Sequence, residues 1–186
     1  TDSFDIDFTH KENSFDDYEY QILLPHKLSQ MGPALAKGDI NNDGLDDIYI
    51  GGANGFSPKL YLQKNNGNFY LINPSYWQKQ SAFEDIDALF VDINNDGFQD
   101  IYVVSGGNEY EDKNSNYNDR VYINDGRGNF SRGDIIDLSP HSGSIVKASD
   151  YDNDGDIDLF IGGRHIPHQY PLPASSMLLR NDNGQL

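Results

Sequence analysis

The sequence predicts an all-β fold in which short antiparallel strands form about three similar four-stranded units. An acidic loop that leads into an apolar strand occurs three times along the chain. Turn sequences typical of hairpins, Asn66-Gly67 and Asp125-Gly126, follow later strands. No segment places apolar residues at the helical period of 3.6 over ten residues. Recurrence at a fixed period indicates a repeat architecture.

The three repeats are GDINNDGLDDIYIGG from Gly38, VDINNDGFQDIYVVSGG from Val91 and SDYDNDGDIDLFIGG from Ser149. Their leading aspartates, Asp39, Asp92 and Asp150, are 53 and 58 residues apart. These intervals are somewhat above the roughly 40 to 50 residues of common propeller blades, and the excess lies in the loops. We therefore predict an N-terminal segment over 1–32, followed by blades over about 33–80, 86–138 and 144–186. A β-sandwich with acidic loops is the alternative, but sandwich strands rarely repeat the same loop chemistry three times.

The strands of each unit can be read from residue type. Each loop leads into apolar, mostly β-branched or aromatic residues at 48–50, 101–103 and 159–161, and two glycines follow each of these strands. After a connection of variable length, a second strand and a glycine-containing turn follow. Each repeat therefore predicts a unit of antiparallel strands with its acidic loop between the first and second strands.

The composition restricts the classes of partner. Thirty acidic residues against thirteen basic ones give a net charge of −17, which repels nucleic acid and anionic membrane surfaces and attracts cations. The chain contains no cysteine, and no apolar run approaches the roughly 20 residues of a membrane span. The first ten residues do not form a signal peptide and lack an initiator methionine, so we expect an excised or processed segment.

The acidic loops have the spacing of a calcium site. Counted from the leading aspartate, oxygen-bearing side chains recur at positions 1, 3, 5 and 9, with glycine at position 6. Ca²⁺ takes six to eight oxygen ligands, and a glycine lets the loop bend and present the carbonyl of position 7. We predict about three Ca²⁺ ions, held by Asp39, Asn41, Asp43, Leu45 and Asp47, by Asp92, Asn94, Asp96, Phe98 and Asp100, and by Asp150, Asp152, Asp154, Asp156 and Asp158.

Two other interpretations of the loops are weaker. An EF-hand uses the same early positions, but it needs a glutamate at position 12 and flanking helices. Position 12 is Ile50, Val103 or Ile161, each inside a predicted strand. An acidic turn that binds nothing could explain one copy, but three matched copies favour metal ligation.

These loops resemble the FG-GAP and VCBS repeats, which form integrin-like β-propellers with Ca²⁺ in loops of the form DxDxDGxxD. The similarity extends from Pro33 to the C-terminus, and the flanking segments look like bacterial FG-GAP proteins related to the ASPIC/UnbV group. The resemblance implies about seven blades, whereas this chain supplies about three. We therefore expect a partial propeller, whose remaining blades come from the parent chain, and an extracellular, periplasmic or cell-surface location.

The resemblance also places ligands at the end of the propeller opposite the calcium loops. Two long connections, 106–120 and 162–176, are expected there. Aromatic, basic and amide side chains in such loops suit sugars or protein surfaces. The candidate ligand-face residues are Tyr110, Tyr117, Arg120, Arg164, His165, His168 and Tyr170.

The sequence favours binding over catalysis. It has no GxSxG elbow and no phosphate-binding loop, and two histidines three residues apart are a weak signal for a transition metal. We predict a non-catalytic module that recognises protein or carbohydrate. The alternative is the propeller portion of a polysaccharide-active or other hydrolytic enzyme, for which the candidate carboxylates are Glu84, Asp85, Glu109, Glu111 and Asp112.

Overall fold

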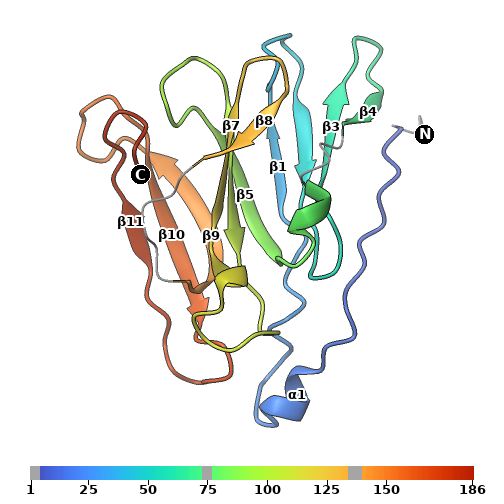
Figure 1. Ribbon diagram of the computed structural model, residues 1–186, viewed down its shortest axis with the longest axis vertical. Helices are drawn as coiled ribbons and strands as arrows, with labels where there is room; N and C mark the ends of the chain where they lie inside the picture. The colour runs from blue at the N-terminus through green and yellow to red at the C-terminus, as the bar shows by residue number, and fades with distance from the viewer. Residues whose placement is uncertain (1–4, 73–76, 134–139) are drawn as a thin grey trace.

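The computed structural model describes residues 5–72, 77–133 and 140–186, which form three antiparallel sheets of four, four and three strands (Figure 1). The all-β prediction is therefore confirmed. The predicted blades 33–80 and 86–138 each include a few residues outside the described ranges. No described helix is long and apolar enough to cross a membrane.

The first sheet follows an extended N-terminal segment. This segment contains one short helix, α1 (Asp17–Tyr20), whose first turn is capped by the Asp16 carboxylate. The sheet has the order β1 (Leu35–Gly38), β2 (Asp47–Ile50), β3 (Lys59–Gln63) and β4 (Phe69–Ile72). A short 3₁₀ helix, η1 (Trp77–Gln80), leads from it to the second sheet.

The second and third sheets repeat this up-and-down order. The second has β5 (Asp85–Val91), β6 (Asp100–Ser105), β7 (Arg120–Asn124) and β8 (Phe130–Arg132), with a 3₁₀ helix, η2 (Ser115–Tyr117), before β7. The third has β9 (Ser142–Ser149), β10 (Asp158–His165) and β11 (Met177–Leu179). The prediction of four strands per unit is confirmed for the first and second sheets. The third sheet has three strands among the described residues.

The three sheets pack face to face in chain order. The first strands are neighbours, because β1 contacts β5 and β5 contacts β9. Strand residues alternate between two faces, so Ile101 and Val103 of β6 pack toward the first sheet while Tyr102 and Val104 pack toward the third. Burial of both faces explains why β6 reads as an unbroken apolar run.

The free faces of the first and third sheets differ. Ile6 and Phe8 of the N-terminal segment pack against Ile50 and Tyr61 on the free face of the first sheet. The free face of the third sheet leaves three large apolar side chains exposed, and the cross-strand register of β9, β10 and β11 places them on one side: Ile145, Phe160 and Leu178. One end of the array is partly covered and the other is open.

Candidate metal centre and the opposite loop end

The three acidic loops lie together at the top of Figure 1, each between the first and second strands of its sheet. Asp39 at position 1 of the first loop accepts hydrogen bonds from the backbone N–H groups of Asp43 (3.0 Å) and Gly44 (2.7 Å). Gly44 has φ of +85°, a conformation that favours glycine. The same pattern of bonds recurs from Asp92 and from Asp150. The three loops are therefore the same structure, as their sequences predict.

The aspartate at position 9 ties each loop to its sheet. Asp47 is fully buried, and its two carboxylate oxygens accept from the backbone N–H groups of Ile40 (3.1 Å) and Gln63 (2.9 Å). Asp100 and Asp158 make the corresponding pairs of bonds. Burial, reinforced by the charges of the other loop carboxylates, raises the pKa of Asp47 and of Asp100 to about 6.

The third loop brings carboxylates close enough to share a cation. One carboxylate oxygen from each of Asp150, Asp152 and Asp158 lies within 4.8 Å of the others, and no other such group of acidic, histidine or cysteine side chains occurs in the described ranges. Desolvation and the charges of Asp154 and Asp158 raise the pKa of Asp152. An all-oxygen set of this kind fits a hard cation such as Ca²⁺.

The first two loops have an asparagine where the third has Asp152. The side-chain oxygen of Asn41 accepts from the backbone N–H of Asp43 (3.0 Å), and Asn94 makes the equivalent bond. An amide carries no charge, so these two loops concentrate less negative charge than the third. The sequence difference thus has a direct electrostatic consequence.

Position 7 is consistent with ligation through the main chain. The side chain of Asp156 accepts hydrogen bonds from the side chain of Asn95 and from the backbone N–H of Asn183 (2.6 Å). Leu45 and Phe98 carry no side-chain oxygen at this position. In all three loops the main-chain carbonyl is therefore the group that position 7 has in common.

Asparagines join neighbouring loops, a role that the sequence analysis did not assign. Asn124 donates from its side-chain amide to the carbonyls of Ile40 in the first loop (2.6 Å) and Gln99 in the second (3.0 Å). The side-chain amide of Asn181 likewise donates to the carbonyls of Ile93 in the second loop and Ile157 in the third. In the first sheet, the residue at the equivalent place, the end of the third strand, is Gln63. An asparagine at or just after the end of the third strand occurs in both the second and the third repeat, and this recurrence was the sequence signal for the role.

The opposite end carries α1 and the long connections, at the bottom of Figure 1. The structure buries three of the predicted ligand-face residues, Tyr117, Arg120 and His165. Of the others, Tyr110 and His168 are half-buried, whereas Arg164 and Tyr170 are exposed. The interior positions of the first three correct their assignment to a binding surface, because a side chain without solvent access cannot contact a ligand there.

Arg120 instead neutralises a buried aspartate between the first and second sheets. Its guanidinium pairs with Asp85, which also accepts from the Tyr49 hydroxyl (2.9 Å) and the Gly52 backbone N–H (3.0 Å). The Phe83 ring lies 4.2 Å from the guanidinium carbon. Arginine at 120 was misassigned because burial comes from packing between sheets that are distant in sequence.

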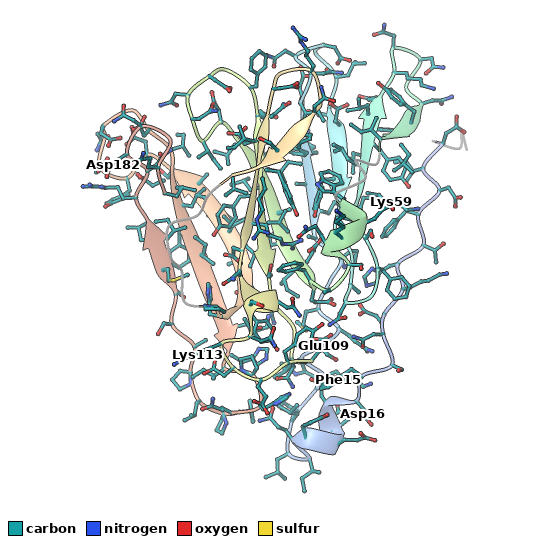
Figure 2. All side chains as sticks on the ribbon, in the orientation of Figure 1. Phe15, Asp16, Lys59, Glu109, Lys113 and Asp182 are labelled. Atoms are coloured by element: carbon teal, nitrogen blue, oxygen red, sulfur yellow. The ribbon has the colours of Figure 1, made fainter. Side chains whose placement is uncertain are left out.

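Two further carboxyls lie near this pair, of which Glu84 is buried and Glu109 is half-buried. Burial, with the charges of Glu109 and Glu12 nearby, raises the pKa of Glu84 to about 9, and burial raises that of Glu109 to about 7. Glu84 accepts from the backbone N–H of Asn54 (2.6 Å), and Glu109 accepts from the Asn13 side chain (3.3 Å). Figure 2 shows Glu109 above Phe15 and Asp16. These groups join the N-terminal segment to the loops of two sheets.

Asn108 forms a second junction with the N-terminal segment. Its side chain donates to the Asp17 carboxylate (2.9 Å), contacts the His165 ring (3.2 Å) and accepts from the His168 backbone N–H (3.1 Å). Burial lowers the pKa of His165 to about 4, so this imidazole is neutral at pH 7. The two histidines serve this junction through Asn108, and their contacts give no support to a transition-metal site.

Comparison with known protein families gives one match. A family model described as FG-GAP-like repeat matches residues 39–103 and again 92–161. Each match begins at the first aspartate of an acidic loop, and each extends into the second strand of the following sheet. A comparison with curated proteins found no match.

Proposed function

The chain belongs to the FG-GAP-like repeat family, and from this premise we propose that it is a calcium-binding part of a β-propeller that recognises protein or carbohydrate outside the cell. The observation that carries the proposal is the triple of carboxylates in the third loop, built on a loop structure that occurs three times. The ASPIC/UnbV-related grouping remains part of the proposal.

Calcium would act mainly as a structural ion. The loops gather acidic side chains in a chain of net charge −17, and the position 9 aspartates are buried, with raised pKa values at Asp47 and Asp100. A divalent cation offsets this repulsion and favours the ionised carboxylates. Extracellular calcium modules bind at about 10⁻⁴ to 10⁻³ M, which matches a location where calcium is abundant.

Two of the candidate catalytic carboxyls are poorly placed for hydrolysis. Asp85 and Glu84 are almost fully buried, the first against Arg120 and the second against the Asn54 backbone. A carboxyl that acts on a glycosidic bond must reach its substrate. Glu111 is exposed and Asp112 half-buried. We therefore assign recognition, and not hydrolysis, to this chain.

The open face of the third sheet supports continuation of the array. Asn42 and Asn95 of the first and second loops each donate to the loop of the next repeat, and Asn153 occupies the same left-handed position in the third. Asn153 and the exposed Phe160 lie where a following repeat would make these contacts. We propose that further blades of the parent protein pack here.

Calcium titration by isothermal calorimetry tests the proposal. We expect about three sites, with the third loop binding most tightly because it carries the extra carboxylate of Asp152. Asp152→Asn should weaken that site about tenfold, which corresponds to about 1.4 kcal/mol. Asp46→Asn is the matched control, because Asp46 lies in the first loop outside the ligand positions.

Two results would contradict the proposal. Absence of any calcium-dependent heat would remove the metal assignment. Equal effects of Asp152→Asn and Asp46→Asn would show that calcium responds to total charge and not to the loop geometry.

A further inference from the structure

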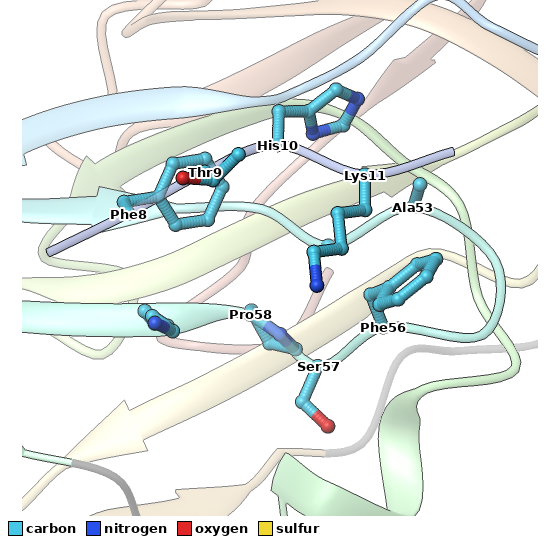
Figure 3. A pocket seen from close by; sticks show the side chains of 10 residues that line it. Phe8, Thr9, His10, Lys11, Ala53, Phe56, Ser57 and Pro58 are labelled. Atoms are coloured by element: carbon cyan, nitrogen blue, oxygen red, sulfur yellow. The ribbon is translucent and has the colours of Figure 1, made fainter. Parts of the chain in front are cut away.

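A pocket of about 270 Å³ lies between the N-terminal segment and the connection from β2 to β3. Figure 3 shows this pocket from close by. One wall consists of Phe8, Thr9, His10 and Lys11, and residues 52, 53 and 56–59 form the other. The pocket lies away from the acidic loops, because the β2–β3 connection leaves the opposite end of the sheet.

The pocket is basic in a strongly acidic protein. Its lining includes Lys11, Lys59 and His10 but no aspartate or glutamate, although acidic residues outnumber basic ones by thirty to thirteen. Two acidic residues, Asp7 and Glu12, flank this wall in the sequence, and Glu12 is paired with the His10 imidazole. The local charge therefore favours an anion.

The two ammonium groups differ in how they are held. Lys59 donates to the backbone carbonyl of Asp7 (3.1 Å) and lies 5.7 Å from the centre of the Phe8 ring, which leaves further N–H donors. Lys11 is exposed and forms no hydrogen bond or ion pair within the described part of the chain. Its side chain extends across the pocket between the rings of Phe8 and Phe56 (Figure 3).

The walls of the pocket are held by the protein interior. The backbone N–H groups of Gly52 and Asn54 donate to the buried carboxyls of Asp85 and Glu84. A Cβ at Gly52 would lie 2.0 Å from the backbone oxygen of Phe56, so only glycine permits this close turn. On the other side, the Asp7 carbonyl also accepts from the Tyr61 hydroxyl (2.8 Å). Both walls are thus positioned before any ligand arrives.

We propose that this pocket binds a small carboxylate carried on a ring, such as a hexuronate sugar or an aromatic acid. Lysine ammonium groups bind carboxylates through charge-assisted hydrogen bonds, and the rings of Phe8 and Phe56 with Pro58 offer flat apolar surfaces to the body of the ligand. This inference rests on the proposed recognition function and names its ligand class.

The test is titration of the calcium-loaded chain, followed by ¹H–¹⁵N nuclear magnetic resonance, with D-galacturonate, benzoate, neutral D-galactose and inorganic phosphate as probes. We expect shifts at residues 8–11 and 52–59 with one or both carboxylates, weaker at high salt, and none with galactose. Preference between galacturonate and benzoate then distinguishes a sugar acid from an aromatic acid.

Substitutions locate the binding. Lys11→Met keeps the length of the side chain and should weaken carboxylate binding about tenfold, the effect of losing one hydrogen bond to a charged group. Lys147→Met is the control, because this lysine is exposed on the third sheet. The spectrum of each free variant shows whether it is folded.

Several outcomes would overturn the inference. These are no shift with either carboxylate, equal binding of galactose or phosphate, or unchanged affinity in Lys11→Met. Calcium titration of the same samples separates the two proposals, because a chain that binds calcium but no carboxylate loses only the ligand assignment.

Discussion

The two ends of the sheets both concentrate carboxyl groups, but they balance the charge differently. At the acidic-loop end, the carboxylates at positions 1, 3 and 5 are exposed or half-buried, those at position 9 are buried, and the third loop includes the triple. At the opposite end, Asp85 is neutralised by the guanidinium of Arg120, and Glu84 has a raised pKa. We propose that the acidic-loop end depends on a cation from solution, whereas the opposite end carries its own cation or keeps a proton.

This difference matches the roles proposed for the two ends. A repeated loop that depends on calcium can stabilise every repeat in the same way, so its sequence recurs. The opposite end is stabilised by contacts specific to each connection, such as Asn108 with Asp17. Its surface is therefore free to differ between repeats, and the basic pocket is found there.

The largest expected effect comes from removing the internal cation. Arg120→Met should lower the free energy of unfolding by about 3 to 5 kcal/mol, because Asp85 would remain buried without its partner. Urea denaturation measures the change. Arg127→Met, at an exposed arginine of the same sheet, should change stability by less than about 0.5 kcal/mol. Equal effects of the two substitutions would contradict the assigned role of Arg120.

Removal of the external cation tests the other end. If each loop binds Ca²⁺ with Kd near 10⁻⁴ M, about 1 mM calcium contributes roughly 1.4 kcal/mol per site and about 4 kcal/mol in total. Scanning calorimetry of calcium-loaded protein should therefore show a melting temperature many degrees lower after addition of EDTA. An unchanged melting temperature would exclude a structural role for calcium.

The smallest effect, when it is compared over a single pH unit, concerns the proton on Glu84. Its pKa is about 9 in the folded chain against an ordinary value of 4.5, so the folded state binds the proton more tightly than the unfolded state. Stability should therefore fall as pH rises from about 4.5 to about 9, by up to about 1.4 kcal/mol per pH unit. Glu84→Gln stays neutral and should flatten this slope in urea unfolding measured between pH 5 and 9.

The control for this substitution is Glu111→Gln, at an exposed glutamate of the nearby long connection. This substitution should leave the slope of unfolding free energy against pH as it is in the native chain. A slope that is the same in the native chain and in Glu84→Gln would show that Glu84 is ionised in the folded protein. The two ends would then share one form of charge balance.

Much of the fold could be predicted because its signals are local. The spacing of oxygen-bearing residues around Gly44 depends on the bending of one loop, and the strand after it follows from residue type. Asp47 was predicted as a ligand position from the same spacing, but its two bonds to backbone N–H groups depend on where β3 begins. That second role could not be seen within the loop.

The sequence by itself determined the all-β class, the repeats and the loops in which carboxylates are gathered, because each of these depends on residues within one short segment. Only the tertiary structure decided that Arg120 is internal, that Glu84 is buried and that Lys11 borders a pocket. These outcomes depend on contacts between segments tens of residues apart. Burial there follows from the packing of whole sheets and from the path of the N-terminal segment across the first of them.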